Sequence, residues 1–217
     1  MEKKHVPYGP YEKCFKRPID FCCGLAAVIV FSWLYLILIV LGAIFMRGNP
    51  FFTQDRPGKD EKVFKLIKFR TMDNRRDKDD YLLPDEVRLN KYGRFLRKTS
   101  LDELPEAFNI IKGDMSVIGP RPLLVKYLPY YSEEHHHRHD VRPGLSGYAQ
   151  VHGRNAVSWD EKFEMDIVYV NHITFLGDVK IIFDTVLKAF IKQEGISSAT
   201  SATMEDFVDY AKLKAKM

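Results

Sequence analysis

Two adjacent acids, Asp102 and Glu103, lie in the stretch TSLDELPE at residues 99–106 and are the first side chains that could do chemistry. Aspartate is a favoured N-cap, and acids in a first turn offset the helix dipole. The same electropositive helix end can keep a carboxylate ionised, as a nucleophile or magnesium ligand must be. Because Pro105 is tolerated only in a first turn, we predict an amphipathic helix from Asp102 to Gly113. Taken alone, the pair is more simply explained as a helix cap. The neighbouring residues must decide between a cap and a catalytic pair.

Side chains suited to phosphate occur in five segments outside this pair. The segments are KFRTM, GRFLRK, GPRP, VRPG and HGRN, and their cations are Lys68, Arg70, Arg94, Arg97, Lys98, Arg121, Arg142 and Arg154. An arginine fork matches the oxygens of a phosphate, and tight glycine turns let backbone amides approach an anion. Each cation alone is more simply an exposed charge. Five separate segments together favour a site for a phosphorylated ligand.

Magnesium is the metal that this combination favours. Mg²⁺ prefers hard oxygen ligands and usually binds through one or two acids together with a substrate phosphate. The histidines do not predict zinc, because no cysteine or glutamate accompanies them at a zinc-binding spacing; they include His135, His136, His137, His139 and His152. The chain also contains no Walker A loop, no GxGxxG and no serine-hydrolase elbow. The residues therefore indicate an acid pair that acts on a phosphorylated ligand.

Residues 21–46 form an apolar run without a charged side chain. A helix needs about 20 apolar residues to cross the hydrocarbon core, so the run is long enough to span it. Basic residues flank it on both sides, and the asymmetry that orients a single crossing is missing. Cys22 and Cys23 lie within the run, and with Cys14 they form no metal or redox pattern, which favours a reducing compartment. Two arrangements stay open: a transmembrane helix, or a hairpin that enters and leaves by one face.

The rest of the chain has the composition of a globular domain of 217 residues. Turn residues before an apolar stretch at 63–69 predict a strand in a hairpin, and apolar periodicity predicts helices at 87–96, 123–132, 159–169 and 178–193. We expect a loosely ordered tail from Gly195. The net charge of +4 is too small to identify a partner, and the chain has no nucleic-acid-binding signature. We expect no nucleic acid among the partners.

Six segments, in order along the chain, resemble the bacterial sugar transferase family. They are KRPID, FTQDRPG, KFRTM, SLDELPEAFNIIKGDMSVIGPRPLL, HRHDVRPGLSGYAQVHGRN and WDEKFEMDIVYV. The chain is similar to the small, monotopic phosphoglycosyl transferases that consist of the catalytic domain alone. The resemblance implies a mainly helical α+β fold with a re-entrant helix-break-helix anchor, interfacial amphipathic helices and a small β-hairpin. It divides the chain into an anchor at 1–48, a catalytic domain at 49–195 and a tail at 196–217.

The activity that the resemblance implies is a ping-pong transfer of a phosphosugar from a UDP-sugar to polyprenyl (undecaprenyl) phosphate, with release of UMP. Asp102 would be the nucleophile and Glu103 its partner, and the pair would hold Mg²⁺. Substrate-binding residues would be Lys68, Arg70, Arg97, Pro120, Arg121, Pro122, Arg142, Arg154 and Asp166. Cations are needed there, because an anionic nucleophile approaches a doubly charged diphosphate.

The anchor is the point at which the chain departs from this family. A Ser-Pro pair breaks the family's membrane helix, whereas here the aligned residues are Ser32 and Trp33. The serine can still bond a carbonyl of the preceding turn and bend the helix. We expect both ends on the cytoplasmic face of the bacterial inner membrane, where the domain meets membrane lipids and the carrier. The apolar helix faces could equally form the interface of a homodimer. Two functions other than the transferase stay open: a non-catalytic adaptor that binds lipids, and a membrane-anchored phosphohydrolase.

Overall fold

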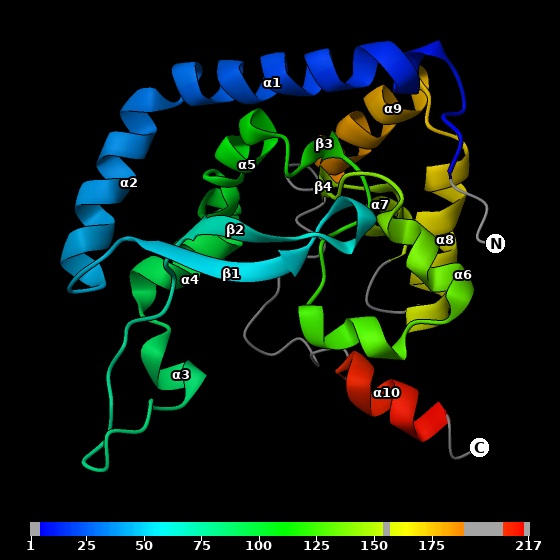
Figure 1. The fold of residues 1–217 in the computed structure, drawn as a ribbon. Coiled ribbons are helices and arrows are strands. Elements are labelled where there is room, and N and C mark those ends of the chain that lie inside the picture. The colour runs from blue at the N-terminus through cyan, green and yellow to red at the C-terminus, as the bar shows by residue number, and fades with distance from the viewer. Residues whose placement is uncertain (1–4, 154–156, 189–205, 215–217) are drawn as a thin grey trace.

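A computed structural model describes residues 5–153, 157–188 and 206–214. Figure 1 shows a hairpin across the middle of the molecule, with α1 (Lys16–Val30) along one side and α2 (Ser32–Phe45) turning away from its end. Helices α8 (Trp159–Asn171) and α9 (Phe175–Val186) lie at the far end of α1. The predicted mainly helical α+β fold is confirmed.

The hairpin pairs β1 (Phe51–Pro57) with β2 (Val63–Phe69) in antiparallel register, with Phe51 opposite Phe69. This confirms the predicted strand and hairpin. A second, parallel pair joins β3 (Ser116–Ile118) to β4 (Gly144–Ser146) and was not predicted. Its strands approach so closely that a Cβ atom on Gly144 would lie 2.0 Å from the amide nitrogen of Gly119. Glycine is therefore required at position 144.

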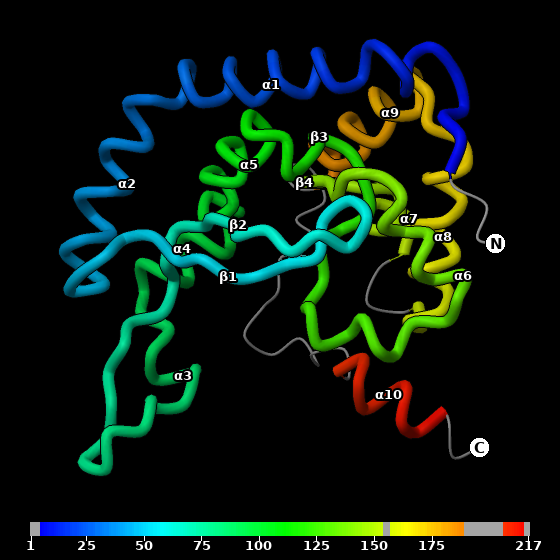
Figure 2. Tube along the Cα trace, viewed as in Figure 1, coloured from blue at the N-terminus to red at the C-terminus, as the bar shows by residue number. Residues whose placement is uncertain are grey.

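The predicted helices are confirmed in part. Helix α8 begins at Trp159 as expected, and α9 begins three residues before the predicted start. The helix predicted at 87–96 is split into α3 (Asp85–Arg88) and α4 (Lys91–Thr99), because the side chain of Asn90 caps a new helix. The segment from β2 to α4 extends away from the body of the domain (Figure 2). The stretch predicted at 123–132 is a 3-10 helix over Val125–Tyr130, and two short helical turns follow, α6 (Glu133–His136) and α7 (Tyr148–His152).

The helix predicted to begin at Asp102 begins later. Residues Leu101–Glu103 form a separate 3-10 turn, and α5 runs over Glu106–Lys112 with Pro105 at its N-cap. Ser100 has a left-handed backbone (φ 55°), which ends α4 and sets up the turn. Asp102 thus precedes α5 and does not cap it. The predicted stop at Gly113 is confirmed, because its positive φ of 97° suits glycine.

A bend of 65° separates the two halves of the apolar run. Phe31 joins α1 to α2, so the break lies next to the predicted Ser32. Among the described residues, the Ser32 hydroxyl makes no hydrogen bond, so the expected bond to the preceding turn is absent. Packing explains the bend instead: Gly24 of α1 lies against α5, whereas the Tyr35 hydroxyl of α2 donates to the carbonyl of Leu104 (2.5 Å).

Polar contacts fasten α1 to the rest of the domain. Arg17 donates to the carbonyls of Ile110 and Ile111 at the end of α5 (2.6 and 2.7 Å). The buried carboxylate of Asp20 accepts from the Ser116 hydroxyl (2.7 Å) and the Val117 amide (3.0 Å). Lys16 pairs with Asp178 of α9 at 2.6 Å. The KRPID segment is therefore a set of structural ties.

Apolar side chains cover the outward faces of α1, α2 and α9. The exposed ones include Ile29, Val30, Trp33, Leu36, Val40, Ile44, Leu176, Val179, Phe183 and Val186. Within the described part of the chain, no single helix is long and apolar enough to cross a membrane. By length and composition, only the bent pair of Tyr11–Val30 and Ser32–Phe45 passes this test, either as a broken span or as a re-entrant loop.

The region predicted as a loose tail contains a helix. Residues Phe207–Lys214 form α10, and Phe207 is buried in an aromatic cluster with Tyr127, Tyr131 and Phe163. The predicted lack of order from Gly195 is therefore wrong for α10, because Phe207 packs this helix into the aromatic cluster. Residues 195–205 of that predicted tail, and residues 189–193 at the end of the helix predicted at 178–193, lie outside the described residues.

Candidate functional site

One cavity of about 1340 Å³ is lined by six of the side chains that the sequence suggested. Its lining includes Lys68 from β2, Arg97 from α4, the acid pair from the 3-10 turn, and Arg121. Segments more than thirty positions apart in the chain thus meet around two carboxylates. The cavity is the candidate active site.

Glu103 is the most tightly held acid of the site. Its Oε1 atom accepts from Nζ of Lys68 and from Nη2 of Arg121, both at 2.7 Å. Burial alone would raise the pKa of this carboxyl, but Arg121 and Lys68 outweigh it and lower the pKa to about 2. Glu103 is therefore ionised across the physiological pH range.

Asp102 is held in a different environment. Burial and the neighbouring charge of Glu103 raise its pKa to about 6, although Lys68 and Arg97 oppose that shift. This differs from the expectation that a helix terminus would favour the anion, because Asp102 lies one turn before α5. Within the described residues, Asp102 makes no ion pair. Its carboxylate is mostly ionised at neutral pH and is not engaged by a cation.

A third acid, Glu106, belongs to the cluster and was not predicted. It is 3% exposed, and its Oε1 lies 3.1 Å from Nζ of Lys68. Burial and the charge of Glu103 raise its pKa to about 7. Lys68 thus bridges two acids one helical turn apart. The spacing of Glu103 and Glu106 in DELPE is the signal that could have identified it.

The other predicted residues at the cavity differ in how they are held. Arg97 lines the cavity, and its Nε donates to the hydroxyl of Thr71 at 3.1 Å. This bond does not use the two terminal nitrogens of the guanidinium group. The side chain of Arg121 is 43% exposed. Pro120 and Pro122 are buried on either side of it, and the carbonyl of Pro120 accepts from the amide of Gly144 (3.0 Å). The two prolines therefore position Arg121 and do not themselves line the cavity.

Asp166 lines the cavity through a buried ion pair. Nη2 of Arg138 lies 2.6 Å from Oδ2 of Asp166, and the two side chains are only 2% and 5% exposed. The same nitrogen donates to the backbone carbonyl of Arg121 (2.9 Å), so this pair supports the loop that carries Arg121. Sequence reasoning missed Arg138, although it stands within the HRHDVRPG segment.

Four predicted phosphate ligands lie among the described residues but do not line the cavity: Arg70, Arg94, Lys98 and Arg142. Arg94 and Lys98 are exposed on α4. Arg142 donates to the carbonyl of Gly113 at 2.8 Å and satisfies the end of α5. Arg70 is half-buried, its Nε atom has no hydrogen-bond partner, and it does not line the cavity. Arg154 lies outside the described residues.

The cavity lining also includes apolar side chains. They are Ala27 of α1, Ala107 and Ile110 of α5, and Ile182 and Val186 of α9. The cavity therefore combines charged side chains suited to phosphate with apolar side chains, some of them from helices that have exposed hydrophobic faces.

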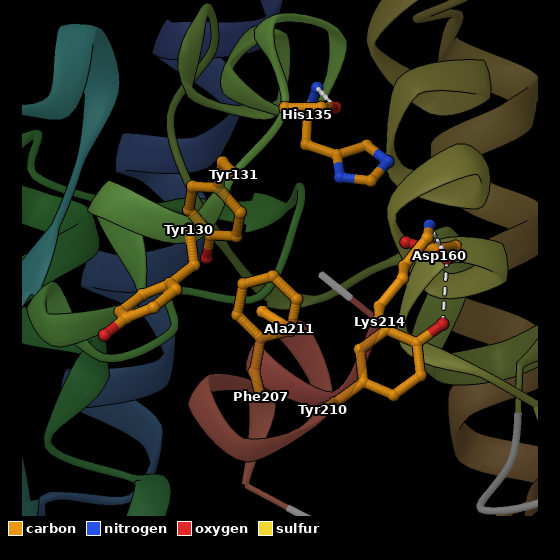
Figure 3. Close-up of a pocket in the computed structure, with 9 residues that line it drawn as sticks. Tyr130, Tyr131, His135, Asp160, Phe207, Tyr210, Ala211 and Lys214 are labelled. Atoms are coloured by element: carbon orange, nitrogen blue, oxygen red, sulfur yellow. Dashed lines mark hydrogen bonds and ion pairs between the residues drawn. The ribbon is translucent and has the colours of Figure 1, made fainter. Parts of the chain in front are cut away.

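A smaller cavity of about 300 Å³ lies beside α10 (Figure 3). Aromatic rings of Tyr131 and Phe207 line it, and Tyr210 and Lys214 both reach Asp160 of α8 (2.8 and 2.5 Å). These contacts fasten α10 to α8. The acid pair is absent from its lining, so the larger cavity is where chemistry is expected.

Comparison with known proteins agrees with this geometry. Residues 11–192 match the bacterial sugar transferase family. The chain belongs to this family. It is 46% identical over 192 residues to the uncharacterized sugar transferase EpsL of Bacillus subtilis, covering 88% of this chain and 95% of EpsL. It is 35% identical over 188 residues to the exopolysaccharide production protein ExoY of Rhizobium meliloti, covering 79% of this chain and 83% of ExoY.

Larger relatives share only the sugar transferase region. The chain is 34% identical over 197 residues to the UDP-glucose:undecaprenyl-phosphate glucose-1-phosphate transferase of Klebsiella pneumoniae. That match covers 86% of this chain but 42% of the Klebsiella protein. The chain thus spans nearly all of EpsL and about two fifths of the Klebsiella protein.

Proposed function

We propose that this sugar transferase moves a sugar 1-phosphate from a UDP-sugar to undecaprenyl phosphate and releases UMP. The observation that carries the proposal is one cavity whose lining combines an acid pair, Lys68 and Arg121 with apolar side chains. The cations suit a diphosphate, and the apolar side chains suit a lipid carrier. The names of the Klebsiella relative and of an undecaprenyl-phosphate galactose phosphotransferase from Salmonella typhimurium, 33% identical to this chain, describe the same class of reaction.

The reaction proceeds in two displacements. A carboxylate oxygen of Asp102 attacks the phosphorus that bears the sugar, and the bond from that phosphorus to the bridging oxygen breaks, so UMP leaves with the bridging oxygen. An oxygen of the carrier phosphate then attacks the same phosphorus, and the bond to Asp102 breaks. The carboxylate is regenerated and the lipid carries a sugar diphosphate. Asp102 suits the role because it is largely ionised near neutral pH and makes no ion pair among the described residues.

Mg²⁺ is the proposed cofactor, and the acid pair is where it would be held. Oε1 of Glu103 already accepts from two cations, which leaves Oε2 and the carboxylate of Asp102 as oxygen ligands. Bound there, the ion would neutralise charge on the diphosphate and the leaving UMP. Lys68 and Arg121 orient Glu103 for this purpose.

The apolar faces of α1, α2 and α9 are proposed to sit in one leaflet of the bacterial inner membrane, with the domain on the cytoplasmic side. Both ends of the bent pair are tied to the same domain. Arg17 near the start bonds to α5, and the side chain of Asn90 donates to the carbonyl of Phe45 at the other end (3.1 Å). Because both ends of the bent helix pair contact the same domain, a re-entrant anchor is favoured over a helix that crosses the membrane. A re-entrant anchor of this kind would hold the cavity near the depth of the carrier phosphate.

UMP release tests the proposal directly. Purified protein is incubated with Mg²⁺, undecaprenyl phosphate and each of a panel of UDP-sugars, and UMP is measured. We expect carrier-dependent turnover with at least one sugar, and its loss in Asp102→Asn. Turnover that continues unchanged in Asp102→Asn would refute the nucleophile, and release of free sugar phosphate without the carrier would indicate a hydrolase.

A further inference from the structure

Three metal-binding side chains meet away from the acid pair. Glu61 comes from the turn between β1 and β2, and His136 and His139 come from the segment that leads to β4. Each offers one ligand atom, and these atoms lie within 4.8 Å of one another. None of the three residues lines the large cavity. The cluster is therefore separate from the site of phosphosugar transfer.

His139 is the residue that a simple hydrogen-bonded cluster does not explain. It is 5% exposed, and neither ring nitrogen makes a hydrogen bond of normal geometry. Such a buried, unpartnered polar group is costly, and it calls for a ligand. Its Nδ1 atom lies 3.6 Å from Oε1 of Glu61.

The spacing suits a divalent ion of the zinc type. With metal–ligand bonds of about 2.0–2.1 Å, two ligands of a tetrahedral site lie about 3.3 Å apart, close to the Glu61–His139 separation. Glu61 and His136 contact each other directly and must part to admit an ion. Their side chains are 37% and 36% exposed, so they are free to move and leave room for water as a further ligand.

The surrounding charges permit a cation. Arg138 stands between the two histidines in the chain, but its guanidinium group is paired with Asp166 at 2.6 Å. Glu61 supplies a negative charge to the cluster, and imidazole nitrogen with carboxylate oxygen is a ligand set that Zn²⁺ accepts.

We propose that Glu61, His136 and His139 bind one Zn²⁺ ion, with water completing the coordination. The ion would join the turn of the β1–β2 hairpin to the segment that contains Arg138. The hairpin carries Lys68, and Arg138 supports the loop of Arg121. The role of the ion is to hold these two parts of the domain together. The site is distinct from the proposed Mg²⁺ at the acid pair and does not depend on the transferase proposal.

Zinc titration of the full-length, tag-free protein in detergent tests this site. The protein is first treated with a chelator, excess Mg²⁺ is added to occupy the acid pair, and ZnCl₂ binding is followed by calorimetry together with the thermal unfolding midpoint. We expect one Zn²⁺ per chain and a raised midpoint. The variants Glu61→Gln and His136→Gln change partly exposed residues and should still fold. Each should weaken zinc binding at least about tenfold, since even loss of an outer-shell partner costs that much.

His137→Gln is the matched control. His137 is a neighbouring histidine of the same segment, but its Nδ1 atom is paired with Asp140 (2.9 Å). This variant should bind zinc as the unmodified protein does. The proposal is overturned if the unmodified protein binds no zinc, or if Glu61→Gln and His136→Gln bind it with unchanged affinity.

Discussion

The ammonium group of Lys68 lies 2.7 Å from Oε1 of Glu103, which joins the hairpin to the acid pair across 35 positions of sequence. Lys68 also lies 3.1 Å from Glu106, so one cation serves two acids. Charge-assisted bonds of this kind are short and directional. Lys68 therefore fixes the position of Glu103 beside Asp102.

Replacement of Lys68 by methionine should slow UMP release about 10²-fold or more, because a preorganised charge at the reacting phosphate is lost. Turnover rate is the measurement. Lys65→Met is the matched control, since Lys65 lies on the same strand with 74% of its side chain exposed and its ion-pair partner in the described part of the chain is Asp55. Its rate should not change. Equal losses in the two variants would show that the hairpin, not the charge, matters.

The rate of UMP release should depend on the ionisation of Asp102. Its pKa is raised from 3.8 to about 6, and only the anion can attack phosphorus. As pH falls below the raised pKa the nucleophile becomes protonated, so the single-turnover rate should drop roughly tenfold per pH unit below about 6 and level off above it. A rate that stays constant across this range would contradict the assignment.

The ion pair of Arg138 and Asp166 should contribute strongly to stability. Asp166→Asn leaves the buried guanidinium of Arg138 without its counter-charge, which typically costs about 3–5 kcal/mol of the free energy of unfolding. Chemical denaturation in detergent measures this. The control is Asp55→Asn, whose partner Lys65 is 74% exposed, and its loss should cost less than about 1 kcal/mol. Similar losses in both variants would show that burial of the pair is unimportant.

Membrane attachment should depend on the outward face of α2. The double variant Leu36→Glu with Ile44→Glu places two charges where 65% and 62% of each residue is exposed, and these charges oppose insertion into lipid. We expect weaker co-flotation with vesicles that contain anionic lipid. Tyr81→Glu changes an equally exposed residue (72%) in the segment before α3 and should float normally. Unchanged flotation of the double variant would rule out α2 as the membrane contact.

Local patterns were enough to predict the hairpin, α8 and most of α9, because each has a continuous apolar periodicity. They were not enough for the parallel pair of β3 and β4, whose three-residue strands carry no period. The position of the acid pair was also misjudged. The left-handed backbone at Ser100 is followed by a 3-10 turn before α5. The residue types in TSLDELPE do not indicate this turn.

Site residues could be predicted where the residue type itself indicates a function, such as a cation for phosphate. They could not be predicted where a side chain depends on a contact with a distant segment of the chain. Arg97 and Arg121 are cations in segments that begin with glycine, Lys68 is a cation of the KFRTM segment, and all three line the cavity. Arg142 is also a cation of a predicted phosphate-binding segment, yet it satisfies the carbonyl of Gly113 at the end of α5. The meeting of Glu61 with His139 depends on the fold, because a hairpin turn must pack on a segment far along the chain.

The central claim is that Asp102 carries the phosphosugar, and trapping this species tests it most directly. The protein is mixed with Mg²⁺ and its active UDP-sugar without the lipid carrier, quenched in acid, and the peptide that contains Asp102 is examined by mass spectrometry. We predict a phosphosugar adduct on Asp102, formed with stoichiometric UMP and removed when undecaprenyl phosphate is added. Stoichiometric UMP release with the adduct on another residue, or turnover with no adduct at any time, would contradict the account.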